Sequence, residues 1–208
     1  HLLLGAADQV AGIQKYIASL QGAYAVVVIN RAPHYEAYLR RQKIPYVVYQ
    51  NMWQLLRILR AYKINVLHCH LGHAARIGFL LSFFLPLRLV YTQHFIEPAY
   101  TRTKTKYFSR LLFRLVFFRF FRIVAISQAV AAAIFARGEV PLKKVTIVHN
   151  GIAPTKKRAT GKSKTIVMVC RMQKEKRPEL ILTLARLLPE YSFVVLGAGA
   201  LLADLSAQ

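Results

Sequence analysis

Four histidines lie at the ends of two stretches whose apolar, β-branched composition predicts strands. His68 and His70 are two residues apart, so in a strand both side chains lie on one face, and His73 follows after a glycine turn. His94 follows the next predicted strand. Imidazoles in this pattern can bind a metal ion or line a ligand cleft. The spacing of the first three matches no zinc signature, and no carboxylate is near them in the sequence. We therefore favour a cleft and expect no metal.

A group of cations follows the predicted strand Thr165–Cys170 directly. Arg171, Lys174 and Lys176 occupy one loop between this strand and a helix that Pro178 can open. Cations gathered on such a loop can bind a diphosphate. A solvated basic loop without a ligand is the alternative, and the loop by itself does not decide between them.

Two glycine-containing segments also bear on phosphate binding. Gly12 precedes a predicted helix, where a glycine lets backbone amides approach a phosphate, although an ordinary tight turn has the same composition. The run Gly161-Lys162-Ser163 is no P-loop, because Lys156 stands where the first glycine belongs and a strand follows instead of a helix. Hydrolytic triads are disfavoured, since Asp8 and Asp204 are the only aspartates.

Strand and helix patterns alternate along nearly the whole chain, which predicts a doubly wound α/β fold with a parallel, Rossmann-like sheet covered on both faces. Ligands of such folds bind at the carboxyl ends of the strands, where the histidines and Arg171 lie. The predicted strands are 24–30, 45–49, 65–70, 88–92, 123–127, 144–149, 165–170 and 192–197. The predicted helices are 12–20, 33–41, 52–62, 74–84, 106–121, 128–137 and 178–188.

The domain organisation follows from a break in this alternation. Residues 151–164 are rich in Gly, Thr, Pro and Lys, which is typical of a linker. We therefore expect an N-terminal domain at 1–150 and the start of a second domain at 165–208. The two cysteines, Cys69 and Cys170, fit no metal-binding spacing and are expected to be reduced thiols in a cytosolic protein.

Charge is the main compositional signal. The 208 residues contain 30 Lys and Arg against 8 Asp and Glu, a net charge of +22, which favours anionic partners. The segment 102–122 interleaves aromatic residues with cations, and Lys106, Arg110 and Arg114 share one helical stripe. Such a helix can lie on an anionic bilayer, or be a core helix whose arginines reach the surface. No transmembrane helix is expected, because the uncharged stretch Ile77–Leu87 is too short.

The order and spacing of seven short motifs resembles the group 1 retaining glycosyltransferases of the GT-B fold. The motifs cover nearly the whole chain: Ala11-Gly12-Ile-Gln-Lys, His68-Cys-His70, Thr92-Gln-His94, Val124-Ala-Ile-Ser127, Asn150-Gly151-Ile, Arg171-x4-Lys176 and Gly197-Ala-Gly199. The resemblance implies two Rossmann-like domains, with the acceptor on the first and a nucleotide-sugar donor mainly on the second.

The resemblance also implies residue roles. His94 corresponds to the cleft histidine near the transferred sugar, His70 and His73 to the acceptor cleft, and Asn150-Gly151 to the hinge between domains. Gly12, Arg171, Lys176 and Gly199 correspond to residues around the donor phosphates. The leaving phosphate is expected to accept the acceptor's proton. No metal or other cofactor is expected, because Arg171 and Lys176 would neutralise the diphosphate.

Three departures from the family pattern stand out. Ala11 replaces the first of two glycines, and Arg177 replaces the glycine that commonly follows the lysine. The chain given also ends at Gln208, before the paired glutamates that hold the donor's sugar and ribose, so this stretch alone is expected to be inactive. A bacterial polysaccharide or lipopolysaccharide precursor is the expected acceptor, at the cytoplasmic face of the membrane.

Two other functions stay open from the sequence. A nucleic-acid-binding protein would explain the charge, but no helix-turn-helix or RNA-binding signature occurs, so no nucleic-acid partner is expected. A non-catalytic, membrane-associated remnant that keeps only the acceptor half would explain the basic aromatic segment.

Overall fold

The computed structural model describes residues 2–3, 27–30, 32–70, 72–96, 103–138, 140–151 and 164–206. The chain divides into two compact units, His1–Ile152 and Ala153–Gln208. The division lies inside the linker that the sequence predicts at 151–164. Each unit is described by itself.

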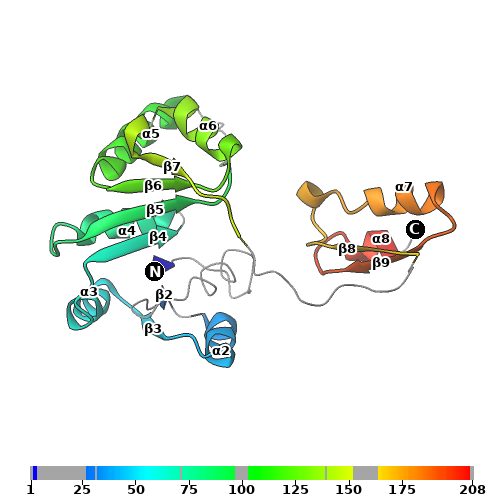
Figure 1. Ribbon diagram of the computed structural model, residues 1–208, viewed down its shortest axis with the longest axis horizontal. Helices are drawn as coiled ribbons and strands as arrows, with labels where there is room; N and C mark the ends of the chain where they lie inside the picture. Colours follow the sequence, from blue (N-terminus) through cyan, green and yellow to red (C-terminus); the bar gives the residue numbers. More distant parts are fainter. Residues whose placement is uncertain are drawn as a thin grey trace. The chain divides into compact units, whose positions relative to one another are not determined.

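The first unit is built on a parallel sheet of seven strands in the order β3-β2-β1-β4-β5-β6-β7 (Figure 1). The predicted doubly wound α/β fold is therefore confirmed, since this order places β1 inside the sheet with later strands added on both sides. The strands are β1 (Leu2–Leu3), β2 (Val27–Asn30), β3 (Tyr46–Tyr49), β4 (Val66–His70), β5 (Arg88–Gln93), β6 (Arg122–Ala125) and β7 (Val145–Ile147).

The helices of this unit return the chain from the carboxyl end of one strand to the start of the next. They are α2 (Pro33–Arg41), α3 (Met52–Ala61), α4 (Gly72–Leu81), α5 (Thr103–Phe118) and α6 (Gln128–Arg137), followed by the 3₁₀ turn η1 (Leu142–Lys144). Local capping explains several of their ends. Asn51 and Ser127 accept hydrogen bonds from backbone amides at the starts of α3 and α6, and Gly138 ends α6 in the left-handed conformation.

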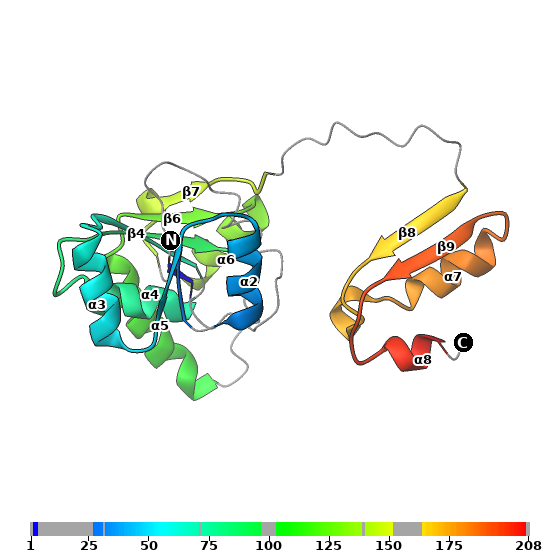
Figure 2. The same cartoon turned by 90° about the horizontal axis from the view of Figure 1, so that it is seen from below.

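One hydrophobic core joins α3, α4, α5 and α6 to a single face of the sheet. Alternate residues of β4 and β5 enter this core, among them Leu67, Cys69 and Tyr91. Their neighbours His68, His70 and Thr92 lie on the opposite face, because successive side chains of a strand alternate. Figure 2 shows the same unit from below, with α4 beside α5. The sheet thus has one apolar face and a polar stripe on the other.

Two helices end earlier than the periodicity predicts. Helix α4 stops at Leu81 because the Ser82 hydroxyl donates to the carbonyl of Phe79, at 2.7 Å, and the next amides form tight i→i−3 bonds. Helix α5 stops at Phe118, after which Phe120 is fully buried in the core. The Phe121 amide then donates to Leu89 at 2.8 Å, at the start of β6.

The second unit contains a parallel pair of strands, β8 (Thr165–Val169) and β9 (Ser192–Leu196), in register over their whole length. The short 3₁₀ turn η2 (Lys174–Lys176) and helix α7 (Leu180–Leu187) connect them, and α8 (Leu202–Ser206) follows β9. Apolar side chains of this pair are exposed, including Val169 and Leu196. Parallel strands are normally buried on both faces.

A close contact between α4 and β4 yields a test of this packing. A Cβ added at Gly78 would lie 2.7 Å from Sγ of Cys69, with Leu67 and Leu89 next nearest. Although alanine favours helix by up to about 1 kcal/mol over glycine, we expect Gly78→Ala to lower the free energy of unfolding by about 1–3 kcal/mol, because Cys69 is fully buried and the core must shift. Chemical denaturation measures the change.

The matched variant removes the sulfur. Cys69→Ala creates room for the new methyl group, so the double variant Cys69→Ala/Gly78→Ala should be more stable than the sum of the two single effects implies. A Gly78→Ala protein as stable as the parent would show that α4 does not lie against β4 as closely as described.

Candidate functional site

The centre of the first sheet is where its strand order reverses. Strand β1 pairs with β2 on one side and with β4 on the other, and Leu3 at its end is in register with His70. Loops leaving neighbouring strands at such a point diverge and open a crevice at their carboxyl ends. His70 is therefore the last strand residue beside the crevice.

Pairing of β4 with β5 brings three histidines and a threonine together on one face. His68 Nε2 lies 2.7 Å from Oγ1 of Thr92, and His70 Nδ1 lies 2.9 Å from Nε2 of His94. The ring centroids of His68 and His70 are 4.3 Å apart, and those of His70 and His94 are 5.1 Å apart. The result is a polar ladder that ends at His94, just past β5.

Burial sets the charge of these imidazoles. It lowers the pKa of His68 and of His94 to about 4, and it lowers the pKa of His70 further, with His68 and His94 adding to the effect. All three rings are therefore neutral at pH 7. In the bond between His70 and His94, one neutral ring donates its N–H and the other accepts.

Gln93 fixes the backbone at His94 from the other face of the sheet. Its Oε1 accepts a hydrogen bond from the Tyr91 hydroxyl at 2.5 Å, and its Nε2 donates to the carbonyl of Phe95 at 2.8 Å. These bonds hold the residues on both sides of His94. Spacing in the sequence predicts no role for Gln93, although it stands inside the Thr92-Gln-His94 motif.

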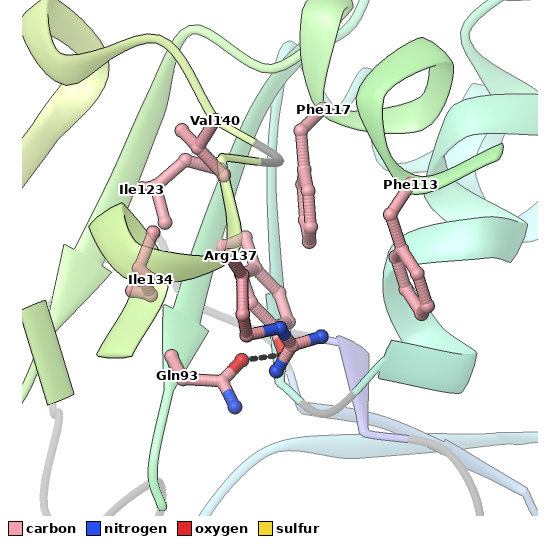
Figure 3. A pocket seen from close by; sticks show the side chains of 8 residues that line it. Gln93, Phe113, Phe117, Ile123, Ile134, Arg137 and Val140 are labelled. Atoms are coloured by element: carbon pink, nitrogen blue, oxygen red, sulfur yellow. Dashed lines mark hydrogen bonds between the residues drawn. The ribbon is translucent and has the colours of Figure 1, made fainter. Parts of the chain in front are cut away.

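The space around Gln93 is almost filled. Figure 3 shows its side chain beside a small cavity between β5, α5 and α6, lined in part by Phe113, Phe117 and Arg137. The cavity volume is about 10 Å³, which is room for about one water molecule. The cavity beside Gln93 is therefore too small for a sugar or a nucleotide, and the packing around it supports His94.

The second unit presents Arg171 on a loop whose backbone is tied to the next loop. Past the ends of β8 and β9, the Cys170 amide donates to Leu196 at 3.1 Å and the Met172 amide donates to Ala198 at 2.9 Å. Met172 is buried, whereas Arg171 between these anchored neighbours is exposed. The guanidinium therefore stands on a fixed backbone at the carboxyl end of β8.

Two glycines permit this close approach of loops. A Cβ at Gly197 would lie 1.8 Å from the Cys170 carbonyl oxygen. A Cβ at Gly199, which has φ +154°, would lie 2.4 Å from the Met172 carbonyl oxygen. In this structure Gly199 therefore serves loop packing; the predicted contact with donor phosphates stays a prediction.

Lys176 and Arg177 complete the loop. Lys176 ends η2, its amide donates to Gln173 at 2.9 Å, and its side chain is exposed. Arg177 adopts the left-handed conformation, with φ 48° and ψ 50°. Glycine adopts that conformation without steric cost. This explains why the resemblance leads one to expect glycine at the position of Arg177.

The other predicted site residues have different outcomes. His73 is exposed in the first turn of α4, beside the end of β4. His70 has no exposed surface and bonds to His94, so it lies behind His94; its place in the acceptor cleft stays a prediction. Gly12 lies outside the described residues. Asn150 and Gly151 are exposed after β7, and their role as a hinge stays a prediction.

A family model places this arrangement among known proteins. The model described as Glycosyltransferase Family 4 matches residues 13–156, which includes all of the strands and histidines described from β2 to β7. The chain belongs to glycosyltransferase family 4. No curated protein sequence matches it significantly.

Solved structures agree with the family 4 assignment at the level of the fold. HepE of Anabaena, in complex with UDP and glucose, superposes with a TM-score of 0.80 at 17% identity over 99% of this chain and 63% of its own. A glycosyltransferase from Rickettsia africae gives 0.72 at 12% identity, covering 99% and 62%. The apo lipopolysaccharide outer core galactosyltransferase WaaB gives 0.63 at 12%, again covering 99% and 62%.

These comparisons establish the GT-B type of fold for the family 4 chain. The chain spans 62% to 63% of the length of these three relatives.

The buried histidines make stability depend on pH. Because their pKa values are lower in the folded chain than the ordinary 6.5, unfolded chains bind more protons below pH 6.5, and folding weakens as pH falls from about 6.5 towards 4. We expect each such histidine to contribute a slope of up to about 1.4 kcal/mol per pH unit in this window. Denaturation at pH 7.5, 6.0 and 5.0 measures it.

Two variants assign the slope. His68→Gln keeps a hydrogen-bond partner for Thr92 but cannot titrate. The slope of its stability against pH should therefore be shallower by the contribution of one histidine. His73→Gln, at an exposed position of α4, should keep the parental slope. Equal slopes in all three proteins would contradict the burial of His68.

The two-loop contact in the second unit can be tested directly. Gly199→Ala should speed amide hydrogen exchange at Met172 and Leu201, because the added methyl group displaces the Met172 backbone that Leu201 bonds at 3.1 Å. Gly151→Ala is the matched control, since a Cβ there meets nothing within 4 Å. Unchanged exchange in Gly199→Ala would show that the loops are not joined as described.

Proposed function

We propose that the protein transfers a sugar, with retention of configuration, from a nucleotide-sugar donor to a glycan or lipid-linked acceptor. The observation that carries the proposal is the loop after β8 in a family 4 chain, where an exposed Arg171 stands between two residues anchored by backbone hydrogen bonds. Cleavage of a sugar–phosphate bond leaves negative charge on the departing diphosphate. Cations held in place before the reaction stabilise that charge most effectively.

Arg171 and Lys176 divide this task in the proposal. The guanidinium of Arg171 presents several N–H donors that fit phosphate oxygens, and Lys176 supplies a second positive charge from the same loop. A loop with these cations has no need of a metal ion, so none is proposed. Gly12 and Gly199 would border the phosphates, with Gly199 acting at least through the packing of the loop.

His94 would lie beside the transferred sugar. A retaining transfer of this kind develops positive charge on the sugar ring, as glycosidic cleavage does. A neutral imidazole can accept or donate a hydrogen bond there without repelling that charge, and burial keeps His94 neutral at pH 7. His70 would act as a positioning residue, because it holds His94 through its ring nitrogen.

The acceptor would bind on the first unit, with His73 at the carboxyl edge of the sheet. The HepE structure holds UDP and glucose, and WaaB acts in the lipopolysaccharide outer core, which supports a UDP-sugar and a bacterial surface glycan as first candidates. Asn150-Gly151, at the end of the first unit, would be the hinge between acceptor and donor domains.

The proposed location is the cytoplasmic face of a membrane. Within the part of the chain that the structure describes, no helix is long and apolar enough to cross a bilayer. Peripheral attachment is supported by the net charge of +22.

Binding of UDP-, GDP- and ADP-sugars to the whole protein tests the donor site. We expect selective binding of one nucleotide class, weakened about tenfold to a hundredfold by Arg171→Ala or Lys176→Ala, because each removes a charge-assisted contact. Calorimetry measures the affinity. Arg186→Ala, an exposed cation in the last turn of α7, should bind like the parent.

Failure has distinct forms. A folded protein that binds no nucleotide-sugar would overturn the transferase proposal and favour a non-catalytic role. Transfer with an inverted anomeric centre in the product, read by NMR, would overturn only retention.

A further inference from the structure

Five large aromatic side chains of the first unit are exposed. The exposed fractions of Trp53, Phe83, Phe84, Phe118 and Phe121 range from 55% to 75%. We call these five residues, with Arg88, Arg119, Arg122 and Lys144, the aromatic-basic surface. Exposed apolar groups gathered in this way usually mark a binding surface.

An apolar groove links two helices within this surface. Met52, Trp53 and Leu56 of α3 face Leu80, Leu81 and Phe84 at the end of α4 across a groove of about 270 Å³. Every lining side chain is apolar. Apart from the indole N–H of Trp53 the lining offers no strong hydrogen-bonding group, so the groove suits hydrocarbon.

Cations lie against the other rings. The Cζ atom of Arg119 is 5.8 Å from the Phe83 ring centroid, and that of Arg122 is 5.3 Å from the Phe121 centroid. Lys144 Nζ is 5.3 Å from the Phe118 centroid. These are distances of cation–π contact, so rings and charges form one continuous surface.

Hydrogen bonds fix the middle of this surface. Arg119 donates from Nη2 to the Ser82 carbonyl at 3.2 Å and from Nε to the Ser82 hydroxyl at 3.3 Å. The end of α5 is thereby joined to the turn that carries Phe83 and Phe84. These bonds fix the backbone of the turn on which the exposed Phe83 and Phe84 lie.

Three cations of this surface lie along the edge where β5, β6 and β7 begin. Arg88 and Arg122 are the first residues of β5 and β6, and Lys144 directly precedes β7. His70 and His94 lie at the opposite ends of β4 and β5. These cations are therefore at the opposite edge of the sheet from the proposed catalytic site.

The sequence around this surface is free of carboxylates. No Asp or Glu occurs between Glu36 and Glu97, between Glu97 and Glu139, or between Glu139 and Glu175. All residues of the aromatic-basic surface fall inside these three stretches. Its partner must therefore be anionic as well as apolar.

We propose that the aromatic-basic surface docks on an anionic bilayer, with the aromatic rings and the groove among the acyl chains and the cations at the lipid phosphates. A nucleic acid would satisfy the cations and stack on rings, but it would leave the aliphatic groove of Met52 and Leu80 in water. Aromatic and aliphatic groups flanked by Arg and Lys match the boundary between headgroups and hydrocarbon. This inference rests on the proposed membrane attachment and not on sugar transfer.

The proposed membrane contact differs in position from the one that the sequence predicts on segment 102–122. The predicted stripe of Lys106, Arg110 and Arg114 lies on α5, and only Arg114 of these has a described side chain. Arg114 and Phe118 both line a groove of about 430 Å³. The C-terminal half of α5 thus extends the aromatic-basic surface, whose main part lies on the turns after α4 and α5.

The single tryptophan of the chain, Trp53, reports on this surface directly. We expect its emission to shift to shorter wavelength when the intact protein is mixed with vesicles of phosphatidylcholine and phosphatidylglycerol. Lipids brominated on their acyl chains should quench it. Vesicles of phosphatidylcholine alone should give a much smaller effect, since about fivefold in affinity is expected for each cation near an anionic surface.

Variants separate the apolar contribution to vesicle binding from the electrostatic one. Phe84→Ser/Phe118→Ser should reduce vesicle partitioning more than tenfold, and Arg88→Gln/Arg122→Gln should reduce it at least about fivefold. Phe135→Ser on α6 and Arg41→Gln on α2 are matched controls outside the surface and should bind like the parent. Circular dichroism confirms folding of each variant.

Several results would overturn the proposal. Vesicle binding without any change in Trp53 emission would place the contact elsewhere. Partitioning that the phenylalanine variants leave unchanged would reduce it to general charge attraction. Binding of RNA in place of vesicles, or a dimer dispersed by Phe84→Ser/Phe118→Ser without vesicle binding, would identify a different partner. Sugar transfer is measured separately, so its failure leaves this result standing.

Discussion

The register of the central parallel strands is the constraint on which the candidate site depends. Leu3 of β1, His70 of β4 and Thr92 of β5 are aligned by backbone hydrogen bonding, so three carboxyl ends coincide at the point where the strand order reverses. A slip of one residue in β4 would turn His68 and His70 into the apolar core and bring Cys69 to the polar face. Packing of Cys69 against Gly78 opposes such a slip, because it holds β4 against α4.

Scarcity of carboxylates shapes the rest of the molecule. Arg122 donates to the Lys143 carbonyl at 2.8 Å and Lys144 donates to the Phe118 carbonyl at 2.5 Å, while aromatic ring faces attract the same cations. Among the described residues, the ion pair between Arg177 and Glu179 is a loose one between exposed side chains. Cations are thus held by carbonyls and rings at the ends of helices, which leaves their charge available to anionic ligands. The imidazoles of His68, His70 and His94, in contrast, are kept neutral at pH 7 by burial.

Much of the fold could be predicted from the sequence. The bounds of α2 and α6 agree with the predicted segments, because Pro33 and Ser127 mark where these helices begin and Gly138 marks the end of α6. Strand positions followed from apolar runs between turn residues. The ends of α4 and α5 could not be predicted, since they depend on the Ser82 hydroxyl and on burial of Phe120, which are tertiary contacts.

The sequence predicts which residues form the candidate site but not how deeply each one is buried. Periodicity indicated that His68 and His70 share a face, and strand ends indicated where His94 lies. That His70 is covered while His94 remains partly exposed depends on packing across the sheet, which spacing does not encode. The support of His94 by Gln93 was missed for the same reason, because it needs the pairing of its side chain with Tyr91 and Phe95.

The different surroundings of the two cysteines have a practical consequence for chemical labelling. Cys69 is fully buried in the first unit and burial raises its pKa to about 12, whereas Cys170 in the second unit is partly exposed. A thiol-specific reagent should therefore attach to Cys170 in the folded protein without any engineered change. Because Cys170 directly precedes Arg171, a fluorophore or spin label placed there would sit at the base of the Arg171 loop. Nucleotide binding could then be followed as a change in the mobility of a single attached probe.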